Sequence, residues 1–253
     1  MVHLALIGIG TGDPDHLTLQ AIRALNSADL ILIPRKGADK ADLAELRRSI
    51  CAAHVRNTAQ VVEFDLPVRV TSGTPYLDSV NEWHDAVAAS WAPLIAAHRP
   101  QGGKVALLVW GDPTLYDSSL RIASRLRAGG LELRTEVVPG LTSLQLLTAA
   151  HAIPLNTLGA PVMITTGRHL RDRGWPEGID TVVVMLDGQC SFQRLPPKDV
   201  TIYWAAYLGM PQQMMLAGPL ASTGLRIREA RAAARAEHGW IMDIYLLRRN
   251  NSA

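Results

Sequence analysis

Short apolar runs alternate with helical patterns along the first 140 residues of the chain. Strands are predicted at 2–8, 30–33, 61–64, 105–110 and 133–138. Between them, apolar residues recur at helical spacing, first at Leu17, Ala21, Leu25 and Ala28 and later within 41–53, 76–97 and 120–126. Strands separated by helices predict right-handed crossovers and a mostly parallel five-stranded sheet. Pro93 is expected to break or kink the third of these helices.

The pattern changes after Pro139 and Gly140, which close the fifth strand. Four further strands are predicted at 162–165, 181–186, 201–205 and 241–247, and one clear helix at 226–237. Segments rich in glycine and proline link most of these strands, which favours a mixed sheet. The sequence therefore predicts an α/β fold with two domains, at 1–140 and 141–253.

Composition and charge limit the classes of function. The chain has 253 residues, of which 48% are hydrophobic, as in an ordinary globular protein. Lys and Arg number 25 against 23 Asp and Glu, a balance unlike that of a dedicated nucleic-acid binder. Two distant cysteines, Cys51 and Cys190, argue against a disulfide framework and against a metal site. The first residues read as a strand and not as a signal peptide, so a cytoplasmic location is expected.

The first strand runs into the glycine-rich segment "GIGTGDPDHLT". Its glycines, Gly8, Gly10 and Gly12, resemble a dinucleotide fingerprint, but that motif requires a third glycine where Asp13 stands. The lysine of a phosphate-binding loop is also missing. Asp13 followed by Pro14 is typical of a helix start. Phosphate binding, a purely structural turn and the close approach of another ligand all stay open for this loop.

Two later motifs also stand where a strand leads into a helix. In "VWGDPTLYDSS", a second Gly-Asp-Pro follows the fourth strand, at the sheet edge where α/β proteins bind ligands. Gly111 permits close approach of a ligand, and Asp112 either caps a turn or faces that ligand. In "EVVPGLTSLQLLTAAHAIPL", Thr142 or Ser143 either caps a helix or faces a ligand in the same crevice, and His151 is expected to cap the end of that helix. Repetition of Gly-Asp-Pro at two strand ends predicts a shared crevice.

These three motifs, in this order, resemble those of the tetrapyrrole methyltransferase family, the class III S-adenosylmethionine (SAM) methyltransferases. The segments that match are "GIGTGDPDHLT", "GDPTLY" and "VPGLTS", and the resemblance extends over essentially the whole chain. The sequence departs from the family at His16, where many members have leucine, and at Asp117, where many have glycine. Other segments resemble a narrower group, the deacetylating C1 methyltransferases of cobalamin synthesis: "VWGDPTLYDS", "TTGRHL", "VVMLDGQCSF", "YWAAYLGMPQQ", "AGPLA" and "HGWIMDIYLLRR".

The resemblance implies two αβα domains with SAM folded into the cleft between them, and commonly a homodimer. It implies that SAM is the cofactor and S-adenosylhomocysteine the product. It also implies that the glycine loop, with Gly10, Thr11 and Gly12, lies beside the cleft where the tetrapyrrole substrate is expected. Carried over by position, the residues expected to contact SAM are Trp110, Gly111, Asp112, Leu115, Tyr116, Thr142, Ser143, Met185, Leu186, Ala206, Tyr207, Gly218 and Pro219.

The implied reaction is methylation of precorrin-5 at C1 with loss of acetate. Loss of the acetyl group requires a base or a water-positioning group. Asp13 or Asp112 is the hypothesis for that role, with helix capping as the competing explanation. Asp117, His169 and Asp187 also fall in predicted strand-end loops.

Arginines are suited to bind the many carboxylate arms of such a substrate. "GRHLRDRG" supplies Arg168, Arg171 and Arg173, and Arg35 and Lys36 follow the second strand. Arg35 and Arg168 are the predicted substrate contacts, and a solvated basic loop is the alternative. Three other functions stay open: a family member that methylates another carbon or a protein or RNA target, an NADP-dependent oxidoreductase in which Arg35 reads the 2′-phosphate, and a non-catalytic binding module.

Overall fold

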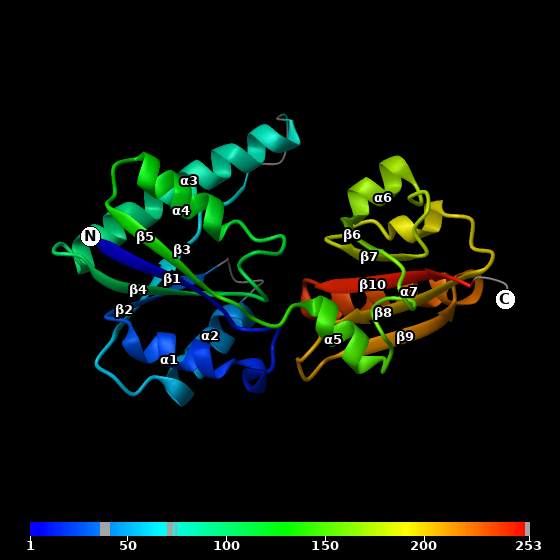
Figure 1. The fold of residues 1–253 in the computed structure, drawn as a ribbon, viewed down its shortest axis with the longest axis horizontal. Helices are drawn as coiled ribbons and strands as arrows, with labels where there is room; N and C mark the ends of the chain where they lie inside the picture. Colours follow the sequence, from blue (N-terminus) through cyan, green and yellow to red (C-terminus); the bar gives the residue numbers. More distant parts are fainter. Residues whose placement is uncertain (36–40, 70–72, 74, 251–253) are drawn as a thin grey trace. The chain divides into compact units, whose positions relative to one another are not determined.

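The computed structural model describes residues 1–35, 41–69, 73 and 75–250. The chain divides into two compact units, Met1–Leu141 and Thr142–Ala253, and each builds its own sheet (Figure 1). No helix in the described ranges is long and apolar enough to cross a membrane.

The first unit is a parallel five-stranded sheet between two layers of helices. Its strands are β1 (Val2–Gly8), β2 (Leu30–Arg35), β3 (Gln60–Asp65), β4 (Gly103–Val109) and β5 (Leu133–Val138), in the order β3-β2-β4-β1-β5. One face carries α1 (Leu19–Ser27) and α2 (Ala41–His54), and the other α3 (Tyr76–His98) and α4 (Ser119–Ala128). The predicted mostly parallel sheet is confirmed.

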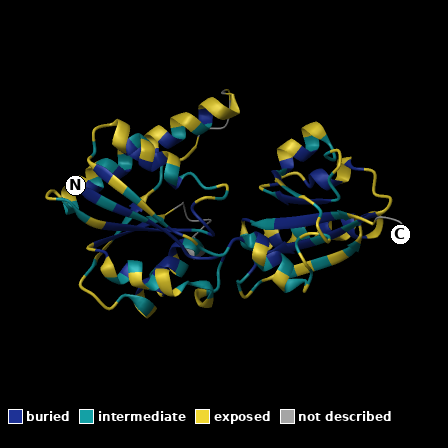
Figure 2. Cartoon of the chain, viewed as in Figure 1, coloured by how far each residue is buried: buried dark blue, intermediate teal, exposed yellow. Residues whose placement is uncertain are grey.

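Side chains that alternate between the two faces of the sheet form two hydrophobic cores, one on each face. In β1, Leu4 and Leu6 pack with α3 and α4, whereas Ile7 faces α1 and α2. Successive strand side chains point to opposite faces, so a strand covered on both sides reads as a continuous apolar run. Figure 2 shows these strands as the buried layer between helices that expose their outer faces. Each fully buried Leu or Ile contributes roughly 1.5–3 kcal/mol.

The second unit is a mixed sheet, as predicted. Its strands are β6 (Val162–Thr166), β7 (Thr181–Met185), β8 (Val200–Ala206), β9 (Met214–Pro219) and β10 (Asp243–Arg249), in the order β6-β7-β10-β8-β9. Only β6 and β7 pair in parallel. Helix α5 (Ser143–Ala150) packs on β7, β8 and β10, α6 (Gly167–Arg173) follows β6, and α7 (Leu220–His238) contacts β8 and β9.

Three elements differ from the sequence expectation. The basic segment around Arg168 forms helix α6, whose seven residues are too few for a periodic apolar pattern. Strand β9 ends in Gly-Pro and is an edge strand with half of its positions exposed, so its pattern is weak. Helix α3 continues through Pro93, which is exposed together with Ala89, so the carbonyl that Pro93 leaves unpaired can bind water.

Candidate functional site

Three loops of the first unit meet at the carboxyl ends of β1, β4 and β5, and glycine makes this possible. A Cβ at Gly8 would lie 2.6 Å from the Gly140 nitrogen and 2.8 Å from the Gly111 oxygen. A Cβ at Gly140 would lie 2.4 Å from the same Gly111 oxygen. Contacts this short do not occur for real side chains, so Gly8 and Gly140 are required because backbone packs on backbone.

Gly111 serves a different purpose from these two glycines. Its N–H donates to the Gly10 carbonyl at 2.8 Å, which ties the loop after β4 to the glycine loop. Gly10 and Gly111 both have positive φ, 74° and 69°. A Cβ at Gly111 would nevertheless meet no atom within 4 Å beyond its chain neighbours. This free space leaves room for a ligand to approach the backbone at Gly111.

The Asp112 carboxylate is fully engaged in holding these loops together. Its Oδ1 accepts hydrogen bonds from the Thr114 N–H, at 2.8 Å, and from the Thr114 hydroxyl, and its Oδ2 accepts from the Gly140 N–H at 2.9 Å. Burial opposes ionisation, but the hydrogen bonds from Thr114 and Gly140 outweigh it and place the pKa of Asp112 below its ordinary value. A carboxylate held ionised by three donors is a weak base, which favours a positioning role.

Asp13 caps a short turn and not the first long helix. Its Oδ1 accepts from the Asp15 N–H at 2.9 Å and so begins a one-turn 3-10 helix, Pro14–His16, with Pro14 at its first position. Thr18 caps α1 instead, because its hydroxyl accepts from the Ala21 N–H at 3.0 Å. The other Asp13 oxygen lies 4.0 Å from His16 Nε2. Asp13 therefore keeps one carboxylate oxygen beyond its capping bond.

The arginines predicted to bind substrate lie in different settings. Arg35 ends β2 and pairs with Asp65 at 2.8 Å on the surface. Arg168 and His169 stand on helix α6, so the expectation of a loop at both positions was wrong. Arg171, on the same helix, contacts Gln189 at 2.9 Å. Lys36 lies outside the described residues.

Three of the expected SAM contacts carry an unusual backbone. Tyr116, Leu186 and Tyr207 have φ of 51°, 54° and 53°, a region that costs free energy for residues with a Cβ. Leu186, directly after β7, is 65% exposed, and Tyr116, in the loop between β4 and α4, is 43% exposed. Strain of this kind persists where the surroundings fix the backbone, and it is frequent at ligand sites.

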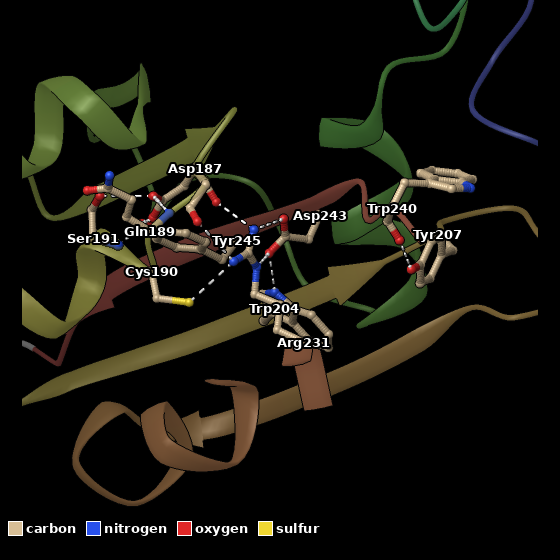
Figure 3. A network of polar contacts seen from close by, with 11 residues as sticks. Asp187, Gln189, Cys190, Ser191, Trp204, Tyr207, Arg231, Trp240, Asp243 and Tyr245 are labelled. Carbon is tan, nitrogen blue, oxygen red and sulfur yellow. Dashed lines mark hydrogen bonds and ion pairs between the residues drawn. The ribbon is translucent and has the colours of Figure 1, made fainter. Parts of the chain in front are cut away.

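A polar network in the second unit fixes the loop that carries Leu186 (Figure 3). The adjacent Asp187 is buried, and its carboxylate accepts from the Ser191 hydroxyl at 2.9 Å and from Tyr245 Oη at 2.6 Å. The N–H groups of Gln189 and Ser191 donate to the same carboxylate. Burial and the negative charge of Asp187 raise the pKa of Tyr245, so this phenol stays a donor.

Arg231 joins this loop to the start of β10. From α7 it binds Asp243 through Nε at 2.7 Å and Nη2 at 3.1 Å, and Nη2 also donates to the Asp187 carbonyl at 2.7 Å. Trp204 Nε1 donates to the same Asp243 carboxylate at 2.8 Å. Burial lowers the pKa of Arg231, but Asp243 outweighs it and the net shift is upward. No sequence pattern indicated this ion pair, because its partners lie on different elements, Arg231 on α7 and Asp243 on β10.

The expected SAM contacts of the second unit do not all lie at the same end of its strands. Strands β7 and β8 run in the same direction with β10 antiparallel between them, so Met185 with Leu186 and Ala206 with Tyr207 share one end. Pro219 instead pairs with Thr201 at the start of β8, roughly 17 Å from Ala206 along the strand. Gly218 and Pro219 therefore lie at the end of the sheet opposite to Met185, Leu186, Ala206 and Tyr207.

Two side chains among these contacts already have partners. Tyr207 is buried, and its hydroxyl donates to the Trp240 carbonyl, so the phenol faces the core and not a ligand. Thr142 caps α5, because its hydroxyl accepts from the Leu144 N–H at 3.1 Å in a capping box with Gln145. His151 ends the same helix, as expected.

Comparison with known proteins identifies the family. Residues 3–223 match the family of tetrapyrrole (corrin/porphyrin) methylases. The chain belongs to this family. It is 51% identical over 251 residues to the precorrin-6A synthase [deacetylating] of a Sinorhizobium species, an alignment that covers 98% of this chain and 96% of that protein.

Solved structures agree with this methylase fold. The cobalamin synthesis related protein CobF of Corynebacterium diphtheriae is 37% identical, with a TM-score of 0.84, and the match covers 99% of this chain and all of that one, 100%. The uroporphyrin-III C-methyltransferase of Thermus thermophilus, solved with S-adenosylhomocysteine, is 20% identical with a TM-score of 0.58 over 97% of this chain and 91% of that one, and shows the fold alone.

Proposed function

We propose that the protein is a SAM-dependent methyltransferase that methylates C1 of precorrin-5 with loss of acetate and forms precorrin-6A. The observation that carries this proposal is the 51% identity, over 98% of the chain, to a precorrin-6A synthase [deacetylating]. Likeness of this extent, without long unmatched segments in either protein, favours a shared substrate as well as a shared fold.

Bound SAM supplies an electrophilic methyl group. The residues proposed to hold it are those whose setting suits a ligand: the open backbone beside Gly111, the strained Tyr116 and Leu186, and their neighbours. The full set is Trp110, Gly111, Leu115, Tyr116, Ser143, Met185, Leu186 and Ala206, with Asp112, Thr142 and Tyr207 as residues that position the backbone. Gly218 and Pro219 leave the set, because they lie at the other end of the second sheet.

The proposed chemistry starts at the acetyl carbonyl of the substrate. A water molecule gives a proton to a base and forms a bond to the acetyl carbon, and the bond from that carbon to C1 breaks. Acetate leaves, and the electron pair stays on C1, conjugated with the macrocycle. That pair then forms the bond to the methyl carbon while the carbon–sulfur bond breaks, and its electrons remain on sulfur as S-adenosylhomocysteine. Alignment of the reacting atoms is the main requirement of the second step.

Asp13 is the better of the two candidates for the base. Both carboxylate oxygens of Asp112 accept hydrogen bonds, three in all, and its pKa is lowered, whereas Asp13 has one carboxylate oxygen that is not used in its capping bond.

Backbone N–H groups of the glycine loop, from Gly10 to Gly12, are the proposed contacts of the macrocycle. Arg35 and Arg168 are proposed to bind its carboxylates, and charge reversal at either is expected to raise the KM for precorrin-5 and leave SAM affinity unchanged.

The test is incubation of the protein with precorrin-5 and SAM, followed by mass spectrometry of the product and assay of acetate. Only the deacetylating reaction removes the acetyl group as it adds a methyl group. A product that gains a methyl group and retains the acetyl group would assign the chain to another methylase. We further propose a cytoplasmic homodimer, as the family resemblance implies, and light scattering of the purified protein tests the dimer.

A further inference from the structure

Arg47 reaches from α2 into the place where strands β2 and β4 separate. The pairing of β2 with β4 ends at Leu32 and Leu107. Because the Ile9 N–H donates to the Val109 carbonyl, the preceding carbonyl, of Leu108, points to the opposite side, toward β2. Strand β2 continues to Arg35, but its pairing with β4 has ended before this point, and Arg47 Nε donates to the Leu108 carbonyl at 3.0 Å. The guanidinium thus lies at the carboxyl end of β4, three residues before Gly111.

This location is a ligand-binding position in the topology of the sheet. The connection that leaves β2 passes to the face of α1 and α2, whereas the connection that leaves β4 passes to the face of α4. Adjacent parallel strands whose connections leave to opposite faces open a crevice at their carboxyl ends, and α/β proteins bind ligands in that crevice. The contact of Arg47 with the Leu108 carbonyl places it at this position of the sheet.

Arg47 is buried without an acidic partner. Only 7% of its surface is exposed, and its second hydrogen bond goes from Nη1 to the Leu43 carbonyl of its own helix at 2.7 Å. Within the described ranges, Nη2 has no acceptor and no carboxylate lies within ion-pair distance of the guanidinium. Burial lowers the pKa of Arg47 to about 10, and the more distant charge of Asp117 offsets this only in part.

Two other arginines, Arg48 and Arg231, have their positive charge balanced by acidic side chains. Arg48, the next residue on α2, is half-exposed and pairs with Glu63 at 2.6 Å and Glu45 at 2.7 Å. Arg231 is largely buried and pairs with Asp243 through two of its nitrogens. Arg47 is almost fully buried and pairs with no acid of the described ranges, and a buried cation of this kind is stabilised by an anion from outside the chain.

We propose that the Arg47 guanidinium binds a carboxylate of a ligand at the carboxyl end of β4. Two ligands of the proposed reaction carry carboxylates, the tetrapyrrole in its side arms and SAM in its methionine portion, and the fork of Nη1 and Nη2 suits either. The choice between them rests on the proposed function, whereas the unpaired buried charge is a property of the chain itself.

The experiment compares Arg47→Met in the full-length protein with the matched control Arg48→Met, which removes the same charge one residue away. Four quantities are measured for each protein: the Tm, the Kd of S-adenosylhomocysteine, the Kd of 5′-methylthioadenosine, which lacks the amino-acid carboxylate, and the KM for precorrin-5. Arg47→Lys keeps the charge without the planar fork and serves if Arg47→Met does not fold.

Arg47→Met is expected to weaken the binding of one of the two ligands, precorrin-5 or S-adenosylhomocysteine, ten- to hundredfold. Arg48→Met is expected to weaken the binding of neither. If the substrate carboxylate binds Arg47, the KM for precorrin-5 rises and both Kd values are unchanged. If the SAM carboxylate binds it, the Kd of S-adenosylhomocysteine rises and that of 5′-methylthioadenosine does not. Arg47→Lys shows the same selectivity with a smaller loss.

A structural arginine gives a different result. Ligand affinities equal to those of Arg48→Met, or an equal rise of all three constants with a lowered Tm, would overturn the proposal. Failure of the wild-type protein to bind S-adenosylhomocysteine and to convert precorrin-5 would instead refute the proposed function, and this result is read from the wild-type protein alone.

Discussion

The Asp112 carboxylate accepts a hydrogen bond from the Gly140 N–H at 2.9 Å and so joins the loop after β4 to the loop after β5. The bond crosses the end of β1, where Gly8 leaves room for both loops. We expect Asp112→Ala to lower the free energy of unfolding by about 1–3 kcal/mol, because the buried donors of Gly140 and Thr114 lose their acceptor.

The same carboxylate predicts a pH dependence. The folded pKa of Asp112 is depressed, so its contribution to stability is present above the unfolded pKa, near 3.9, and is lost as pH falls through the lower folded pKa. Urea denaturation of the wild-type protein and Asp112→Ala between pH 7 and pH 3 measures this. The gap between the two proteins should narrow toward the acid end, and a constant gap would contradict the assignment.

Gly8 tests whether backbone packing is the reason for the first glycine of the loop. An alanine Cβ would lie 2.6 Å from the Gly140 nitrogen, in a place lined by backbone that cannot move aside. Gly8→Ala should therefore lose more than about 3 kcal/mol of stability or fail to fold. Gly188→Ala is the matched control, since its Cβ meets nothing within 4 Å. Similar thermal unfolding of both variants would show that the packing is not required.

The Arg231–Asp243 pair should show strong coupling in a double-mutant cycle. Removal of one partner leaves a buried charge alone, so Arg231→Met and Asp243→Asn should each cost about 3–5 kcal/mol. The double variant should be less destabilised than the sum of the two. Additive losses of stability, measured by chemical denaturation, would mean that the two side chains do not interact.

Both single variants should also weaken S-adenosylhomocysteine binding, because Arg231 holds the Asp187 carbonyl beside Leu186.

Asp13→Asn separates capping from chemistry at the glycine loop. An asparagine oxygen still accepts from the Asp15 N–H, so the 3-10 turn and the Tm should be retained. Loss of a base should slow acetate release in a single turnover by about a hundredfold or more. Wild-type acetate release by both Asp13→Asn and Asp112→Asn would refute the hypothesis that either is the base.

Much of the fold follows from periodicity in the sequence. The three central strands of the first sheet, β2, β4 and β1, are covered on both faces and read as nearly continuous apolar runs, and the two edge strands, β3 and β5, were also predicted although they carry polar residues. Strand β9 and helix α6 were missed for opposite reasons: the strand is a half-exposed edge that ends in Gly-Pro, and the helix is too short to show a period.

The site was predictable only where its residues are local in the sequence. Gly-Asp-Pro after β4 marked the loop of Gly111, and the glycine spacing argued against a dinucleotide fingerprint. No sequence pattern indicated Arg47, because what distinguishes it is the end of the β2–β4 pairing before the Leu108 carbonyl, a property of the folded sheet. The distance between Ala206 and Pro219 likewise follows from strand pairing and not from sequence proximity.

The most direct test of the account is the mass of the product formed from precorrin-5 and SAM by the wild-type protein, with acetate measured in the same reaction. We predict one methyl group gained and one acetyl group lost per turnover, with one equivalent of acetate and of S-adenosylhomocysteine. A methylated product that retains the acetyl group, or no conversion of precorrin-5, would contradict the proposed function.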